Sequence, residues 1–158
     1  MHKLTLLAAA GAVALSGCDF SGTVAPFETP SSIDSIEVSN LRPIFGGENW
    51  DPDGNPDVFV EIRSASGRTF FRSETVTDAD VSETLVFDVE DALVASPTMQ
   101  LFVTVFDMDG DLIDAQEMAS SPAFTAEQVA AGTLELGDQG RGSAAQIVVR
   151  SENEAGDV

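Results

Sequence analysis

The chain has 158 residues, enough for one domain with a core of ordinary size, and nothing in its composition indicates a disordered or fibrous protein. Its formal net charge is -20, which comes from 27 acidic residues against seven basic ones. A surface dominated by carboxylates repels nucleic acid and bare anionic lipid alike, so neither DNA nor RNA is expected as a partner.

Residues 1–17 have the pattern of an export signal. A histidine and a lysine form a short basic start, residues 4–15 are apolar, and small residues follow. Such a stretch is too short to span a bilayer as a stable helix and is typical of a secretory signal. The run Leu15-Ser16-Gly17-Cys18 resembles the lipobox of bacterial lipoproteins, in which the cysteine is acylated and becomes the new N-terminus. Cys18 is the only cysteine, and the alternative is a free thiol without such a role.

Acylation of Cys18 would attach the protein to a membrane, since each buried methylene contributes about 0.8 kcal/mol. We therefore expect a lipoprotein of the cell envelope, with the choice between inner and outer membrane left open. Residues 18–32 contain Gly, Pro and Ser without sustained periodicity and are expected to form the flexible linker behind the lipid. Removal of the signal would also remove the only histidine and the only lysine.

Residues 33–150 contain short apolar stretches, many alternating with a period of two, separated by Gly, Asp, Asn and Pro clusters. This pattern is typical of an all-β sandwich or barrel. The stretch 101–106 is apolar at five of six positions, which predicts a central strand covered on both faces. The expected strands are 33–38, 58–64, 69–76, 83–89, 100–107, 114–119, 133–136 and 145–150.

One short helix is expected to connect two of these strands. Thr125 and Gln128 have the spacing of a capping box, residues 126–131 can continue the helix, and Gly132 can end it. Residues 151–158 are polar and acidic and are expected to form a frayed tail.

Two groups of aspartates stand beside two of the expected strands. The first group precedes the strand at 58–64, and the second follows the apolar stretch 101–106. Grouped carboxylates raise one another's pKa and disfavour the ionised form unless a positive charge lies between them. The candidate metal ligands are Asp51, Asp53 and Asp57 in the first group and Asp107, Asp109, Asp111 and Asp114 in the second.

Calcium is the metal that suits these residues, because it takes roughly six to eight oxygen ligands and tolerates irregular geometry. Zinc, copper and haem are poor candidates, since a mature chain without histidine or a thiol lacks their preferred ligands. Each group alone can equally be a turn in an acidic protein. Two groups, one entering a strand and one leaving another, favour a shared site, because these strand ends can meet at one pole of an antiparallel sandwich.

The aspartate groups and their flanking strands resemble the C2 domain family. The stretch 36–41 is similar to the family's opening strand. Asp51 and Asp57, with Gly54 between them, are similar to its first calcium loop, and 101–109 is similar to the strand that ends in an Asp-x-Asp loop. The resemblance implies an eight-stranded antiparallel β-sandwich that binds calcium at one end.

The same resemblance implies roles for individual residues. Its bridging ligands would be Asp51, Asp57, Asp107 and Asp109, with Asp111 or Asp114 supplying the remaining ligand. Val58 and Phe59 stand where the family usually has proline and tyrosine. The absence of lysine from the mature chain argues against the basic groove with which some family members hold phosphoinositides.

Two functions follow from these patterns. The first is a calcium-dependent module whose bound ions complete their coordination with oxygens of a phospholipid, glycan or protein partner. The second is a structural envelope lipoprotein without such a partner. An enzyme is not expected, because the mature chain lacks the usual bases and nucleophiles. Trp50, beside the first loop, can either insert into a partner or pack under its own loop.

Overall fold

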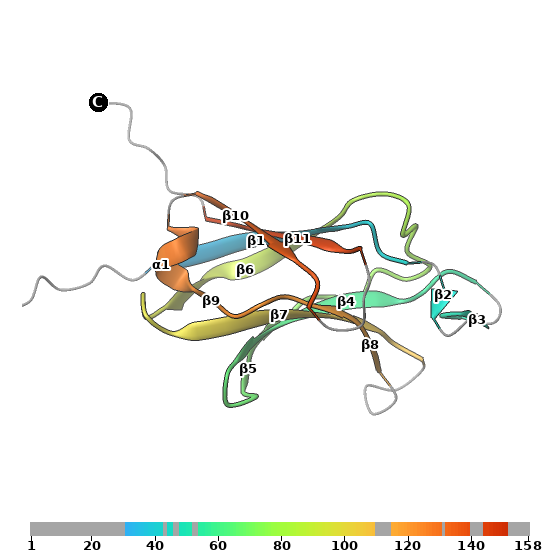
Figure 1. Cartoon of the computed structure of the whole chain (residues 1–158), viewed down its shortest axis with the longest axis horizontal. Helices are drawn as coiled ribbons and strands as arrows, with labels where there is room; N and C mark the ends of the chain where they lie inside the picture. The colour runs from blue at the N-terminus through green and yellow to red at the C-terminus, as the bar shows by residue number, and fades with distance from the viewer. Residues whose placement is uncertain are drawn as a thin grey trace, which may run out of the picture.

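The longer strands in the described part of the chain form two antiparallel sheets that face each other, and a separate two-stranded hairpin lies beside them (Figure 1). This computed structural model describes residues 31–42, 44–45, 48–51, 54–109, 115–130, 132–139 and 144–151. The expected all-β sandwich with one short helix is confirmed. The proposed signal, the lipidated Cys18 and most of the linker and tail lie outside the described residues. Among the described residues, no helix has the length and hydropathy needed to cross a membrane.

Each sheet is built around four strands of four residues or more. The first sheet has the order β10 (Thr133–Gly137), β11 (Gln146–Arg150), β1 (Ser31–Ser39), β6 (Leu85–Ala95). The second has the order β5 (Thr69–Arg72), β4 (Val58–Ser64), β7 (Gln100–Asp107), β8 (Gln116–Ser120). Short pieces complete the set: β9 (Phe124–Thr125) pairs with β7, and β2 (Ile44–Phe45) pairs with β3 (Glu48–Asn49).

The predicted strands agree with these eight, with differences at their ends. The strand expected at 69–76 ends at Arg72, although Val76 still forms an isolated bridge with Val58. The strand expected at 83–89 begins at Leu85 and continues to Ala95. The two-residue strands β2, β3 and β9 were not predicted, because two residues are too few to show a period.

Alternation along the strands places one apolar face of each sheet against the other. On β4, Val58, Val60 and Ile62 are buried in the core between the sheets, and Ile36 and Val38 on β1 belong to the same core. Each fully buried aliphatic side chain contributes about 1.5–3 kcal/mol relative to an exposed one. A shift of one residue in register would turn these side chains outward, so the pattern fixes the pairing.

Strand β7 is covered on both faces, as the stretch 101–106 predicted. Val103 and Val105 lie in the core, while Thr104 and Phe106 are buried on the outer face. The ring of Phe106 stacks on Phe59 of β4, with 5.1 Å between the ring centroids. The centre of the second sheet is therefore rigidly held, and it carries Asp107 at its end.

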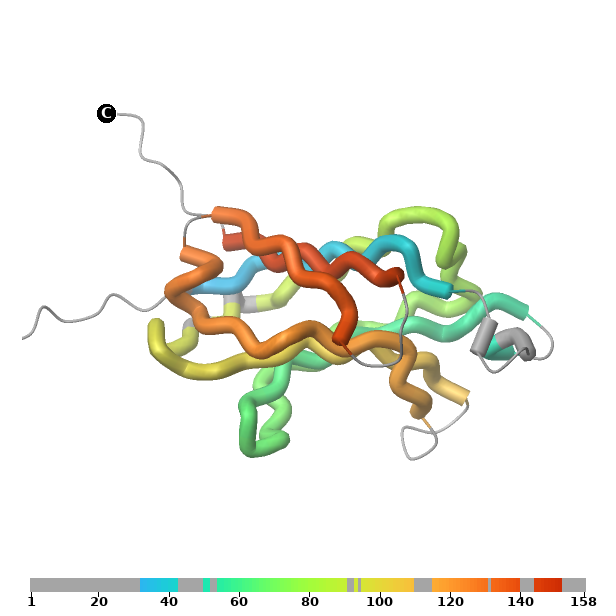
Figure 2. The backbone as a smooth tube through the Cα atoms, viewed as in Figure 1, coloured from blue at the N-terminus to red at the C-terminus, as the bar shows by residue number. Residues whose placement is uncertain are grey.

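Helix α1 (Ala126–Val129) joins the second sheet to the first at one end of the sandwich (Figure 2). The side-chain oxygen of Gln128 accepts the backbone N–H of Thr125 at 2.7 Å, as the capping-box spacing predicted. Gly132 has a φ of +112°, which explains why the chain turns away there. The β2–β3 hairpin lies at the opposite end of the molecule (Figure 1).

Candidate metal centre

Asp107 is a buried carboxylate with only half of its hydrogen-bonding capacity used. Asp107 is the last residue of β7 and pairs with Val58, the first residue of β4. It is fully buried, with 0% of its surface exposed. The Oδ1 atom accepts the backbone N–H of Asp57 at 2.9 Å, whereas Oδ2 is buried and has no hydrogen-bond partner. An unpaired buried carboxylate oxygen is unfavourable unless a proton or a cation lies against it.

Asp57 connects the end of β7 to the neighbouring loop. Its backbone carbonyl accepts the N–H of Met108 at 2.9 Å. Its side-chain Oδ1 accepts the backbone N–H of Asp78, also at 2.9 Å. Three segments that are distant in the sequence are therefore tied together by one aspartate.

The charges of four predicted ligands act on one another. Burial is the main cause that raises the pKa of Asp107 to about 6. The hydrogen bond from the Asp57 backbone opposes this rise, and the charges of Asp109, Asp51 and Asp57 add to it. Burial also raises the pKa of Asp51, followed by the charges of Asp109, Asp57 and Asp78 and a side-chain contact with Asp109. These effects require proximity, so the structure brings Asp51, Asp57, Asp107 and Asp109 to the same end of the sandwich.

Asp78 joins this cluster and was not among the ligands predicted from the sequence. It has a φ of +51°, and its backbone is held by Asp57. A Cβ atom on Gly54 would lie 2.9 Å from Oδ1 of Asp78, so the glycine allows the first loop to approach that carboxylate. The signal that could have drawn attention to it is the alternation in Thr77-Asp78-Ala79-Asp80, which resembles the other two aspartate groups.

The gathered carboxylates do not form a finished ligand shell. Within the described ranges, no three acidic side chains are arranged so that they could hold a metal ion as they stand. Asp109 accepts a hydrogen bond from Nε2 of Gln116 at 2.6 Å, which turns one of its oxygens toward a protein donor. Asp53, Asp111 and Asp114 lie outside the described residues. The donor set and the unpaired oxygen of Asp107 fit a hard cation that binds oxygen.

Trp50 packs under its own loop instead of extending from it. Its residue is buried in the core, and Nε1 donates to the backbone carbonyl of Arg42 at 2.7 Å. Of the two roles considered from the sequence, the structure supports packing. The indole supports the start of the loop that carries Asp51.

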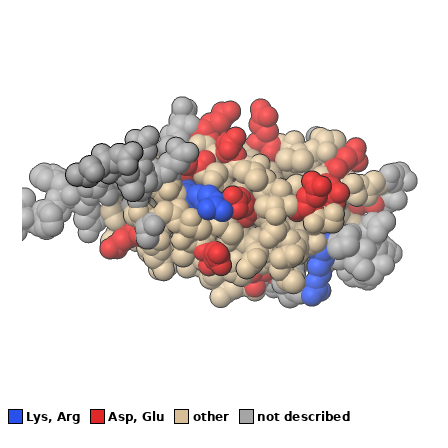
Figure 3. Space-filling model, turned by 90° about the horizontal axis from the view of Figure 1, so that it is seen from above, with Lys and Arg blue, Asp and Glu red and all other residues tan. Residues whose placement is uncertain are grey.

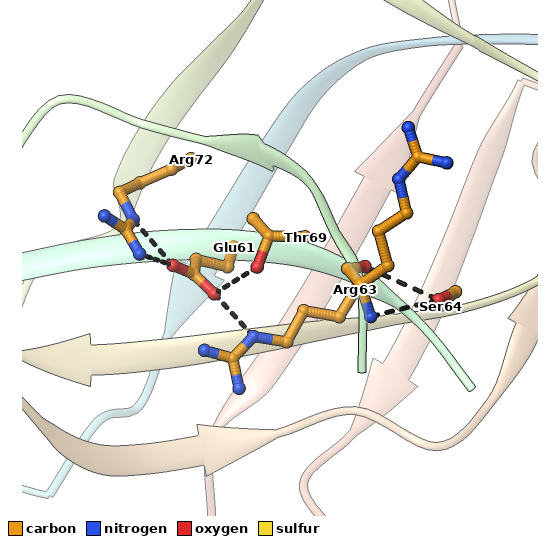
Figure 4. A network of polar contacts seen from close by, with 6 residues as sticks. Glu61, Arg63, Ser64, Thr69 and Arg72 are labelled. Atoms are coloured by element: carbon orange, nitrogen blue, oxygen red, sulfur yellow. Dashed lines mark hydrogen bonds and ion pairs between the residues drawn. The ribbon is translucent and has the colours of Figure 1, made fainter. Parts of the chain in front are cut away.

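A second charged cluster lies on the outer face of the second sheet (Figure 4). Glu61 on β4 is 0% exposed and forms ion pairs with Arg63 and Arg72, while Thr69 donates to it at 3.1 Å. Burial pushes the pKa of Glu61 upward, but the hydrogen bonds and charges of Arg72 and Arg63 outweigh it and hold the pKa below its usual value. Both arginines also lie over aromatic rings, Arg63 over Phe106 and Arg72 over Phe59. The charges of both arginines are therefore largely neutralised by contacts within the protein.

No protein-family model matches the chain, and a search of curated proteins finds no match. Solved structures with a similar fold include several C2 domains. One is a structure of the two C2 domains of Extended-Synaptotagmin 2, at 14% identity and a TM-score of 0.48. The matched region covers 94% of this chain and 48% of the synaptotagmin chain. A calcium-bound structure of the same domains has 17% identity and a TM-score of 0.46, covering 79% of this chain and 47% of that one.

A third structure, "BON1-C2B", has 13% identity and a TM-score of 0.49 and covers 77% of this chain and 89% of that chain. This chain therefore spans less than half of the synaptotagmin structures. At such low sequence identity, the similarity to these structures concerns the arrangement of the strands.

Proposed function

We propose that this protein is a calcium-binding module. The observation that carries the proposal is the buried, unpartnered Oδ2 of Asp107, whose carboxylate stands among the charges of Asp51, Asp57 and Asp109. Removing an ionised carboxylate from water is expensive unless it is paired, and like charges nearby add to that expense. A divalent cation offsets both effects at once.

Calcium is the cation that this donor set favours. The residues that would hold it are Asp51, Asp57, Asp107 and Asp109, with Asp78 as an added candidate from the neighbouring loop. All of them offer carboxylate oxygens, and calcium accepts such ligands in flexible arrangements. Positions left open by the protein would be filled by water or by phosphate or carboxylate oxygens of a lipid, glycan or protein partner.

The test is the melting temperature of the domain in calcium, in chelator, and in magnesium at the same concentration. A ligand that binds only the folded state stabilises it by about 2.7 kcal/mol at a concentration of about 100 Kd. We expect a clear rise in calcium and a much smaller one in magnesium. Equal melting temperatures in calcium and chelator would remove the proposal.

A structural role without a calcium-dependent partner is the second candidate, because no three of the described acidic side chains are arranged to hold a metal ion. The aspartate loops would then be plain turns, or calcium would only stabilise the fold. Sedimentation with phosphatidylserine vesicles, and binding to immobilised glycans and envelope proteins, separates the two. Retention that requires calcium supports the binding module, and stabilisation without retention supports the structural role.

We further propose that Cys18 is acylated and anchors the protein in the cell envelope. The support is the lipobox-like run at residues 15–18. Strand β1 begins at the α1 end of the sandwich, whereas β4 begins at the end that carries the aspartates (Figure 1). The calcium loops would then point away from the tether. A Cys18→Ser protein should lose its acyl mass and leave the membrane fraction, and its retention there at unchanged mass would contradict the anchor.

A further inference from the structure

A groove runs between the terminal strands of the two sheets. Strand β6 ends the order of the first sheet and β5 ends the order of the second. The groove has a volume of about 310 Å³ and is lined by β6 and by the segment that includes and follows the end of β5. This volume lies at the lower end of the range of about 300–1,000 Å³ typical of ligand sites.

One side of this groove is a free strand edge. Among the strands that the structure describes, β6 is paired with β1 alone, so its second edge carries no described strand. An unpaired edge presents a row of backbone donors and acceptors that can accept an additional strand. The part of β6 that lines the groove, residues 86–90, contains neither lysine nor proline, the residues that commonly block such pairing.

The groove also gathers the exposed apolar surface of the domain. Among the residues that the structure describes, Val76 and Val86 are the large hydrophobic side chains that are exposed, at 37% and 56%. Both line this groove, together with Phe71 and Phe87. Exposed apolar side chains that gather at one place mark a contact surface more often than scattered ones do.

The rim of the groove is acidic. Glu74, Asp88 and Glu90 line it, are exposed, and form no ion pair with the described residues. Arg72, the one basic residue of the lining, is paired with Glu61. The face of the molecule seen in Figure 3 likewise carries many scattered acidic side chains and few basic ones. The groove therefore combines an apolar floor with an unneutralised negative rim.

We propose that this groove binds an extended segment of a partner protein in which apolar and basic residues alternate. The segment adds a strand to the free edge of β6. Val86, Asp88 and Glu90 are exposed on one face of β6 and alternate with the buried Phe87 and Val89, so the basic side chains of the segment lie on the face of Asp88 and Glu90 and its apolar side chains lie on the inner face beside Phe87. About five residues at about 3.3 Å each match the length of residues 86–90.

Other occupants fit less well. A second copy of the chain would bring the same three carboxylates toward each other in a symmetric contact, and they would repel. An anionic membrane is repelled by the same rim. A small apolar molecule would leave the strand edge and the carboxylates unused. The aspartates of the cluster do not line the groove, so binding of the segment does not require calcium as a ligand.

The test uses the whole chain and a fluorescent synthetic peptide of eight residues in which valine alternates with lysine, measured by anisotropy in both calcium and chelator. We expect saturable binding to the parent protein. A peptide with glutamate in place of lysine, and one with N-methyl groups on alternate backbone nitrogens, should each bind at least about tenfold more weakly. Loss with the N-methyl peptide identifies strand pairing, because it keeps the charges.

Matched variants separate the groove from the general acidity of the surface. Val86→Lys and the pair Asp88→Lys/Glu90→Lys should each weaken binding of the valine-lysine peptide by about tenfold or more. The control pair Glu127→Lys/Glu135→Lys changes the net charge equally at exposed positions outside the groove and should bind like the parent.

Three results would overturn the proposal. One is the absence of saturable peptide binding to the parent. Another is an equal loss in the groove variants and in the control pair, which would show attraction by overall charge alone. The third is a parent dimer in sedimentation experiments that Val86→Lys converts to a monomer, which would make a second copy the occupant.

Discussion

Asp57 donates its backbone N–H to Oδ1 of Asp107 over 2.9 Å, and this bond joins the start of one strand to the end of its neighbour. It fixes the Asp107 carboxylate in a buried position while Oδ2 remains without a partner. The arrangement stores an unfavourable interaction at the same place where other aspartates gather. A site that is destabilising when empty is one in which a bound cation has a large effect.

Asn in place of Asp107 should separate the effects of charge and hydrogen bonding. The amide oxygen of Asp107→Asn can still accept the Asp57 N–H, but the buried negative charge is gone. In chelator, we expect the variant to melt at the same temperature as the parent or higher. In calcium, it should lose most of the stabilisation that the parent gains. Asp88→Asn, an exposed position on β6, is the control, and a variant that keeps the full calcium response would contradict the account.

The stability of the calcium-free domain should depend on pH through Asp107. The pKa of Asp107 is raised to about 6, mainly by burial, so the folded protein holds this proton more tightly than the unfolded chain does. Ionised Asp107 therefore destabilises the fold above about pH 6, and this penalty fades as pH falls toward the ordinary aspartate pKa of about 3.9.

The measurement is the difference in melting temperature between the parent and Asp107→Asn as a function of pH in chelator. The difference removes contributions from other groups, such as Glu61, whose lowered pKa has the opposite sign. The melting temperature of the parent should rise relative to that of Asp107→Asn as pH falls from about 7 to about 4. Protons and calcium compete for Asp107, so calcium affinity should also fall through about pH 6. A difference that is constant with pH would exclude this role for Asp107.

Asp78 can be tested against a close neighbour in the same loop. Asp78 contributes charge to the cluster at Asp51, whereas Asp80 accepts hydrogen bonds from the backbone and hydroxyl of Ser82. We expect Asp78→Asn to weaken calcium binding by about tenfold, since one carboxylate ligand or neighbouring charge is lost. Asp80→Asn should leave the affinity unchanged. Equal effects of both substitutions would mean that only the overall charge of the loop matters.

Glu61 should be important for stability and irrelevant to calcium. Glu61→Gln leaves Arg63 and Arg72 without their shared carboxylate, and we expect a loss of about 2–3 kcal/mol, at the low end for a broken buried pair because both arginines are partly exposed. Urea denaturation measures this loss. Glu37→Gln breaks the pair with Arg150, whose Nε lies 2.8 Å from Oε1, and this more exposed pair should contribute much less. A loss of similar size in both variants would contradict the burial argument.

Much of the fold follows from local pattern. The bounds of β4 and β7 agree with the strands predicted at 58–64 and 100–107, because apolar runs with clear turn residues beside them mark both ends. Strand β6 is longer than predicted, because its polar residues after Val89 break the alternation while pairing with β1 continues to Ala95. That continuation depends on the partner strand, which a local pattern does not contain.

The candidate site was predictable where its residues lie beside strong strands. Asp57 and Asp107 flank β4 and β7, and the antiparallel pairing of those strands brings them together. Asp78 was missed because its position depends on a backbone bond to Asp57 and on a left-handed backbone conformation. Nothing was predicted for Glu61 from the sequence, because its burial is produced by Arg72 of the neighbouring strand together with Arg63.

The decisive experiment for calcium binding is isothermal titration with calcium, with the parent chain and an Asp51→Asn/Asp107→Asn variant measured under the same conditions. Calcium modules outside cells often have a Kd of about 10⁻⁴–10⁻³ M, so the titration must reach millimolar calcium. We expect saturable binding to the parent and none to the variant. A parent that shows no binding heat and no calcium-dependent change in melting temperature would contradict it.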